Sequence, residues 1–125
     1  MQESNIERGI IMKLLLHIDQ TERWQAVSGN LKNMTVAKQT HPDLELEIVV
    51  TGDAIQNLVN QNRDEQLYQV LKQAVAAGFK IKGCHNSMNH YHLDENQLFD
   101  FVEVVPAGLL EIGEKEAQGW GYVKP

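Results

Sequence analysis

IMKLLLHI, residues 11–18, is a nearly continuous apolar run of strand length, and it is the segment that decides how the chain can fold. Strands of a parallel sheet read as apolar runs of this kind because helices cover them on both faces. DQTERW follows the run, with Asp19 or Thr21 as a candidate helix N-cap. Apolar residues then recur at helical spacing, at Trp24, Val27, Leu31 and Met34. The stretch therefore predicts a buried first strand and a helix that packs on the sheet.

The remainder of the sequence repeats this alternation of strand and helix. Four further strands are predicted by LELEIVV (44–50), FKIKGC (79–84), VEVVP (102–106) and GYVKP (121–125). Helices are predicted near Ile55, after the N-cap Asp64 up to Gly78, and from about Gly108 to Gln118. HNSMNHYHLDENQLFDF, between the third and fourth strands, is expected to be a loop with a short helix from Asp94. Five strands with helices between them predict an α/β fold, with a parallel sheet covered on both faces.

Composition limits the classes of function. The 125 residues fit a polar tail at 1–10 and a single domain at 11–125. The net charge of −6 supplies no basic surface for nucleic acid or for anionic membranes, and the apolar runs are too short to span a bilayer. A single cysteine excludes an internal disulfide, which favours a reducing compartment such as the cytoplasm. No glycine-rich nucleotide-binding loop occurs, and no cofactor is expected.

The candidate site lies at the carboxyl ends of the predicted strands, where ligands gather in open parallel sheets. Cys84, the only cysteine, ends the third strand. Its thiol pKa would fall if a following helical turn aimed N–H groups at the sulfur, or if a protonated His85 lay near. We expect Cys84 in a shallow polar pocket, partly exposed, with Gly52, His85, Asn86 and Ser87 as lining groups. The alternative is a buried, inert cysteine, since free cysteine is among the most buried residue types.

The sequence contains a cluster of possible metal ligands, but it does not predict a metal site. Cys84, His85, His90 and His92 place four ligand-type side chains within nine residues. The segment lacks the paired spacing of known zinc sites, so these histidines are interpreted as solvated loop residues. His17, inside an apolar strand, is interpreted as a hydrogen-bonded core residue.

The sequence resembles the DsrE/DsrF-like family, small α/β proteins that include sulfur-relay subunits. The resemblance rests on MKLLLHIDQTERW, LEIVVTGDAI, GFKIKGCHNSM, FVEVVPAGLLEI and EAQGWGYVKP, and it extends from Met12 to Pro125. It implies a three-layer α/β/α fold with strand order 4-3-2-1-5. For Cys84 it implies transient carriage of sulfur as a persulfide, passed to or from a partner protein. It also implies a closed homo-oligomer, a trimer or a hexamer.

Two functions therefore remain open at this point. The first is a sulfur-relay or thiol-transfer protein that uses Cys84, and the second is a small-molecule-binding or regulatory oligomer in which Cys84 does no covalent chemistry. With either function, we expect a homo-oligomer whose interface lies near the loop that follows the third strand, because a small domain would leave several apolar residues of this loop uncovered. These are Met88, Tyr91, Leu93 and Phe99.

Overall fold

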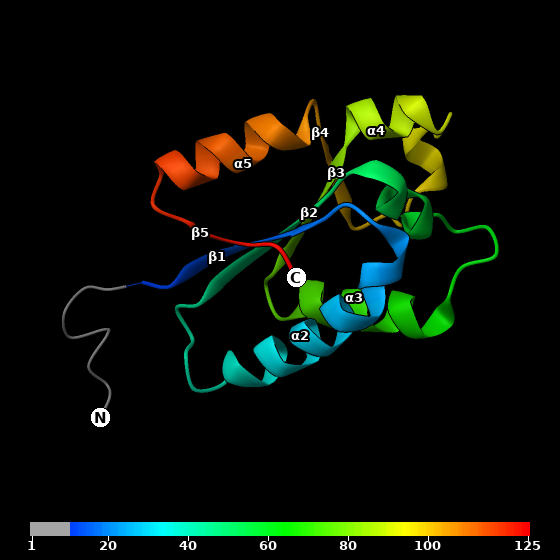
Figure 1. Ribbon diagram of the computed structural model, residues 1–125. Helices are drawn as coiled ribbons and strands as arrows, with labels where there is room; N and C mark the ends of the chain where they lie inside the picture. The colour runs from blue at the N-terminus through cyan, green and yellow to red at the C-terminus, as the bar shows by residue number, and fades with distance from the viewer. Residues whose placement is uncertain (1–10) are drawn as a thin grey trace.

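The protein has a five-stranded sheet placed between helices, as a computed structural model that describes residues 11–125 shows (Figure 1). The strands are β1 (Lys13–Ile18), β2 (Glu45–Val50), β3 (Lys80–Cys84), β4 (Val102–Val105) and β5 (Gly121–Val123). Their order is β4-β3-β2-β1-β5, and each neighbouring pair is parallel. This confirms the α/β fold and the strand order. The predicted tail at residues 1–10 lies outside the described residues, and a single domain at 11–125 stays a prediction.

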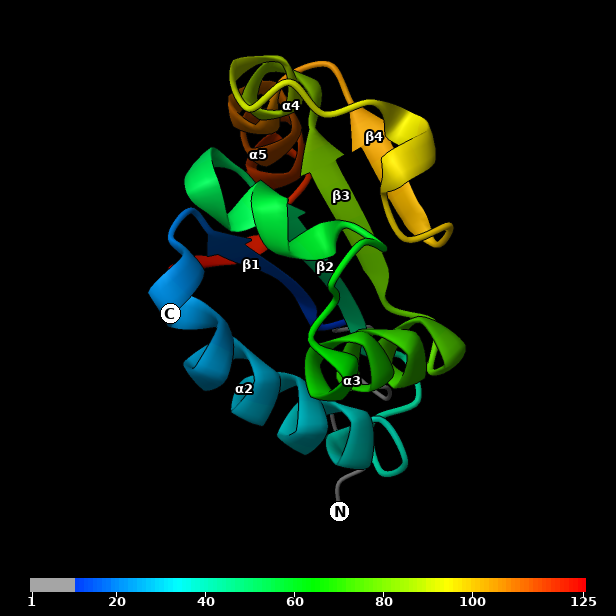
Figure 2. The same ribbon diagram turned by 90° about the vertical axis from the view of Figure 1, so that its right-hand side faces the viewer.

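The helices divide between the two faces of the sheet. They are α2 (Trp24–Ala37), α3 (Glu65–Ala76), α4 (His85–His90) and α5 (Gly108–Ala117), with 3₁₀ helices η1 (Thr21–Arg23), η2 (Gly52–Leu58) and η3 (Glu95–Gln97). In Figures 1 and 2, α2 and α3 lie together on one face, and α5 lies on the other. Right-handed crossovers require this division, since β5 returns across the sheet to the far side of β1. Within residues 11–125, no helix combines the length and the apolar character needed to cross a membrane.

The two faces differ in what they bury. Alternate residues of a strand point to opposite faces, so Leu16 and Ile48 join the large core beneath α2 and α3, whereas Leu15 and Val49 form a small cluster with Ile112 of α5. The same alternation places His17 and Glu47 on the α5 face, and both are buried. Among the described residues, the α5 face is therefore the one that buries polar side chains, His17 and Glu47.

The ends of the helices agree with the sequence at some positions and differ at others. The Asp64 side chain accepts hydrogen bonds from the N–H groups of Gln66 and Leu67, as its predicted N-cap role requires. The predicted caps Asp19 and Thr21 are wrong: Gln20 holds the N-cap position of η1 and makes no side-chain cap bond. Thr21 donates its N–H to Asp53 Oδ1 at 2.9 Å instead, which ties the loop after β1 to η2.

The segment after β3 is more ordered than expected, because residues 85–90 form α4 and not a loop. Histidine, asparagine and serine are weak helix formers, and Met88 is the one apolar anchor of the helix. Met88 is buried in the large core, as is Phe99 farther along the segment. Tertiary packing therefore decides this helix. It also removes Met88 and Phe99 from the surface, so the predicted interface at this loop is wrong for these two residues.

Candidate functional site

Cys84 is the last residue of β3, at the carboxyl edge of the sheet where the sequence places it. The side chain is only 5% exposed, so the expectation of a partly exposed thiol is wrong. The first turn of α5 buries the Cys84 side chain. The sequence alone did not predict that this turn lies against Cys84. A Cβ added to Gly108 would lie 3.5 Å from Cys84 Cβ and 3.4 Å from Val49 Cγ1, so the helix begins in direct contact with β2 and β3.

Several donors surround the sulfur. The Gly108 N–H donates to Cys84 Sγ over 3.3 Å. Burial raises the pKa of the thiol, but hydrogen bonds from the hydroxyl and N–H of Ser87 and from the N–H groups of Gly108 and Asn86 act in the opposite sense, and the resulting pKa lies below its ordinary value. The thiolate is the nucleophilic form of cysteine, so this arrangement favours reactivity at neutral pH.

Gly52 and Ser87 connect the loops on either side of the thiol. The Gly52 N–H donates to Ser87 Oγ at 2.9 Å, which leaves the Ser87 proton free to point at the sulfur. Gly52 has a φ of +58°, and a Cβ there would lie 2.5 Å from the Asp19 carbonyl oxygen. Glycine is therefore required at this position, and it brings the ends of β1, β2 and β3 together. The structure thus groups Gly52, Asn86 and Ser87 around Cys84.

His85 does not join this group as a charge partner. It begins α4 with an exposed side chain, and its Nδ1 lies 3.5 Å from Nδ2 of Asn89. The hydrogen bonds that lower the pKa of Cys84 come from Ser87, Gly108 and Asn86, and His85 is not among these donors. In the part of the chain that the structure describes, no three histidine, cysteine, aspartate or glutamate side chains lie close enough to hold a metal ion.

Two residues of the site were missed in the sequence. Gly108 supplies a hydrogen bond to the sulfur, and the methyl group of Thr51 is the atom closest to where a Gly108 Cβ would lie. Both follow strands whose ends converge at this edge, in the TGD and PAG segments. The strand-end pattern could therefore have suggested them, but not their contact with the thiol.

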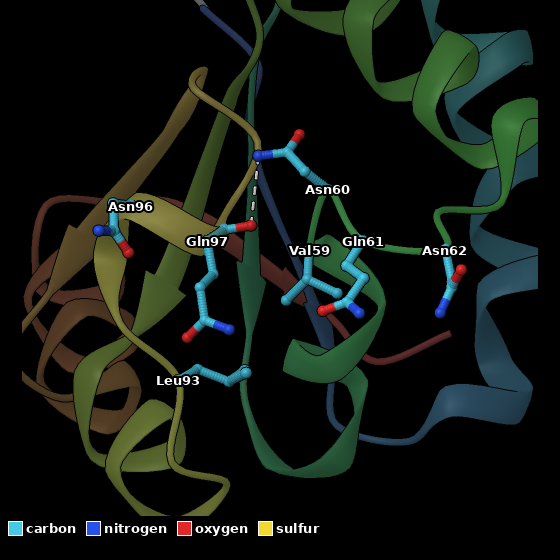
Figure 3. Close-up of a pocket in the computed structure, with 7 residues that line it drawn as sticks. All are labelled: Val59, Asn60, Gln61, Asn62, Leu93, Asn96 and Gln97. Carbon is cyan, nitrogen blue, oxygen red and sulfur yellow. Dashed lines mark hydrogen bonds between the residues drawn. The ribbon is translucent and has the colours of Figure 1, made fainter.

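Cavities lie elsewhere on the molecule. Figure 3 shows one of about 490 Å³ between the chain after η2 and the chain around η3, which the Asn60 N–H joins by a 2.9 Å hydrogen bond to the Gln97 carbonyl. A second, of about 710 Å³, lies between α2 and α3. Cys84 lines neither of them. The case for the Cys84 site thus rests on hydrogen bonding.

Comparisons with known proteins agree on the fold. The solved structure of MTH1491, a protein of unknown function from Methanobacterium thermoautotrophicum, is 20% identical, with a TM-score of 0.78 over 91% of this chain and 99% of that one. The ychN protein from E. coli is 14% identical, with a TM-score of 0.75 over 92% of this chain and 100% of that one. BT1422 from Bacteroides thetaiotaomicron, also of unknown function, is 13% identical, with a TM-score of 0.71 over 90% and 94%.

Sequence comparison gives the family. No curated protein matches the chain significantly. The model of the DsrE/DsrF-like family matches residues 12–125, which is nearly the whole chain and includes every strand of the sheet. The protein therefore belongs to the DsrE/DsrF-like family.

Proposed function

We propose that the protein is a sulfur carrier, which holds a sulfur atom on Cys84 as a persulfide and passes it to a thiol of another protein. The observation that carries the proposal is the hydrogen bonding of Cys84 Sγ by Gly108 and by the start of α4, which lowers the thiol pKa despite burial. Membership of a family that includes sulfur-relay subunits supports the same role.

The proposed chemistry needs no oxidant. The Cys84 thiolate attacks the outer sulfur of a persulfide donor, R–S–SH, so that a new S–S bond forms on Cys84 while the donor's S–S bond breaks. The donor leaves as the thiolate R–S⁻, and the proton of the transferred SH group stays on the Cys84 persulfide or passes to water. An acceptor thiolate then attacks the same sulfur and releases the Cys84 thiolate. Hydrogen-bond donors that stabilise the Cys84 thiolate also suit the anion of the Cys84 persulfide, which carries its charge on the outer sulfur.

Persulfide loading tests this function directly. We expect incubation with inorganic polysulfide to add one sulfur atom to the folded protein, measured by intact mass, and a later excess of a small thiol to remove it. Cys84→Ser is the matched control, since it keeps a side chain of similar size without the thiol, and it should gain no sulfur. Wild-type protein that stays at its unmodified mass while a denatured sample gains sulfur would contradict the proposal.

The burial of Cys84 favours one alternative, a small-molecule-binding or regulatory protein without covalent chemistry. A thiol that is 5% exposed can serve as a packing residue, and the hydrogen bonds would then only satisfy buried polar groups. The loading experiment separates the two functions, because this alternative predicts no sulfur on the folded wild-type protein.

We also propose that the protein works as a homo-oligomer in a reducing compartment, the cytoplasm. The single cysteine supports the compartment, since a carrier thiol must stay reduced between cycles. Leu109 and Leu110 support the oligomer: they are 80% and 63% exposed on the first turn of α5, next to the proposed site. Exposed apolar groups beside a functional site are typical of contact surfaces.

A further inference from the structure

His17 belongs to a hydrogen-bonded group at the carboxyl edge of the sheet that the sulfur-carrier proposal does not use. Its Nδ1 lies 2.7 Å from the Tyr122 hydroxyl of β5, and its Nε2 lies 2.9 Å from Oγ1 of Thr51, directly after β2. The histidine is 9% exposed. Both ring nitrogens are thus occupied by partners on neighbouring strands, and neither is free to bind a ligand or to accept a proton from a substrate.

The surroundings of His17 also argue against a role as a general acid. Burial lowers its pKa, Asp19 acts in the opposite sense, and Lys124 lowers the pKa further. Asp19 and Lys124 pair with each other at 3.0 Å and act on the ring in opposite senses. The pKa lies below its ordinary value, and the imidazole is therefore neutral at physiological pH. What His17 can do is fix the side chains that it touches.

Thr51 is the partner that leads toward the thiol. Its hydroxyl is held by His17, and its methyl group, Cγ2, lies against Gly108 at the first residue of α5. Gly108 donates its N–H to Cys84 Sγ. Threonine has three staggered rotamers, and only one of them directs the hydroxyl at His17 and the methyl at Gly108 together. The hydrogen bond from His17 that selects this Thr51 rotamer therefore also helps to fix the position of Gly108 beside the sulfur.

We propose that His17 is a positioning residue for Cys84: it holds the Thr51 rotamer whose methyl group keeps the Gly108 N–H on the thiol. The relevance to sulfur transfer rests on the proposed function, but the effect itself concerns only the ionisation of the thiol. It is therefore measurable without any sulfur donor. Tyr122 contributes through the hydrogen bond between its hydroxyl group and His17 Nδ1, which holds the ring in place and connects β5 to the site.

The test is the pH dependence of iodoacetamide alkylation at Cys84 in the folded protein. His17→Leu frees the Thr51 rotamer and should raise the apparent pKa of the thiol by about half a unit, because a hydrogen bond to the thiolate is weakened. Thr51→Ser keeps the hydroxyl but removes the methyl group, and it should raise the pKa similarly. Thr51→Val places a methyl group on both branches, and it should leave the pKa unchanged.

The double variant, His17→Leu with Thr51→Val, gives the sharpest comparison. Valine presents a methyl group to Gly108 without help from His17, so the double variant should return to the wild-type alkylation pKa although it lacks the histidine. A purely structural loss would persist in the double variant. An unchanged pKa in His17→Leu, or a double variant as shifted as the single one, would overturn the proposal.

Two features keep the experiment decisive. If His17→Leu does not fold, the pair Thr51→Ser and Thr51→Val tests the same step with His17 in place, and equal pKa values for these two would overturn it. Failure of polysulfide to load the wild-type protein would remove the sulfur-carrier function but would not alter the alkylation comparison. The two proposals can therefore fail separately.

Discussion

Glu47 of β2 carries a carboxyl group inside the protein, beneath α5. The side chain is 1% exposed, and neither oxygen has a hydrogen-bond donor beside it. Lys115 Nζ lies 3.8 Å from Glu47 Oε1 and 3.9 Å from an oxygen of Glu111, too far for a hydrogen bond to either. Burial, the largest cause, and the neighbouring Glu111 both raise the pKa of Glu47, Lys115 and Lys82 lower it by less, and the net result is a pKa of about 8. A proton on Glu47 supplies the missing donor, toward the Glu111 carboxylate.

Because of this raised pKa, the stability of the folded protein should fall as the pH rises. The folded protein holds the Glu47 proton up to about pH 8, whereas the unfolded chain releases it near pH 4.5. The stabilising contribution is therefore complete below the unfolded pKa and is lost as the pH rises through the folded one. Between these values the unfolding equilibrium constant should rise by as much as about tenfold per pH unit.

Glu47→Gln removes the ionisable group and keeps its shape. We expect the variant to lose this component of the pH dependence and to be more stable than the wild type, relative to their difference at low pH, once the pH reaches about 8. Urea unfolding at a series of pH values measures it. Glu45→Gln, on an exposed residue of the same strand, is the matched control and should follow the wild-type curve. Equal pH slopes for Glu47→Gln and the wild type would contradict the assignment.

Residues of this kind mark the limit of what the sequence could predict. The position of Cys84 at the end of a strand was predicted correctly, and His17 was correctly interpreted as a hydrogen-bonded core residue. The burial of Glu47 and the partners of His17 could not be foreseen, because they depend on which helix covers which end of each strand. The burial of Cys84 was missed for the same reason, since Gly108 is distant in sequence.

At the scale of the element, α5 is positioned by a glycine that the helix itself does not need. Ala107 holds the N-cap position, and Gly108 follows as the first helical residue. A Cβ at Gly108 would collide with the Thr51 methyl group, whereas a Cβ at Gly113 in the same helix would meet nothing within 4 Å. The close approach of α5 to the strand ends therefore requires glycine at position 108 and not at position 113.

Gly108→Ala and Gly113→Ala should accordingly act in opposite directions. Alanine is the better helix former, so Gly113→Ala should stabilise the protein by up to about 1 kcal/mol. Gly108→Ala forces the first turn of α5 away from β2 and should destabilise the protein by about 1–3 kcal/mol. Urea unfolding compares them, and alkylation of Cys84 should show a raised thiol pKa only in Gly108→Ala. Equal stabilisation by both substitutions would refute this account of the helix.

The other elements show where pattern is sufficient and where it is not. The strands and the long helices α2, α3 and α5 carry clear apolar periodicity, and they were predicted within a few residues of their ends. The six-residue helix α4 carries no such periodicity and exists because Met88 packs into the core. Short elements next to a site are decided by tertiary contacts, which local sequence does not contain.

At the scale of the whole molecule, the number and kind of strands follow from periodicity, but their order does not. Order 4-3-2-1-5 was implied by resemblance to a family, and parallel pairing with right-handed crossovers then determines which face each helix covers. The outcome is unequal: α2 and α3 share one face, and α5 lies by itself on the other (Figure 1). That helix leaves Leu109 and Leu110 exposed beside Cys84, where a second subunit would complete the surface.

The proposed homo-oligomer can be tested at Leu109 and Leu110. If Leu109 and Leu110 lie in the subunit interface, replacing both with serine should dissociate the protein into chains of 14.2 kDa, because each buried leucine contributes about 1.5–3 kcal/mol to a contact. Light scattering at micromolar concentration measures the mass.

Val36→Ser is the matched control, since Val36 is 64% exposed on α2 and its substitution should leave the assembly intact. A wild-type mass of one chain would exclude the oligomer, and an intact assembly in the double variant would place its interface elsewhere. If the double variant is monomeric and its Cys84 alkylates faster than in the wild type, the partner subunit also shields the thiol, and subunit contact then controls access to the proposed sulfur site.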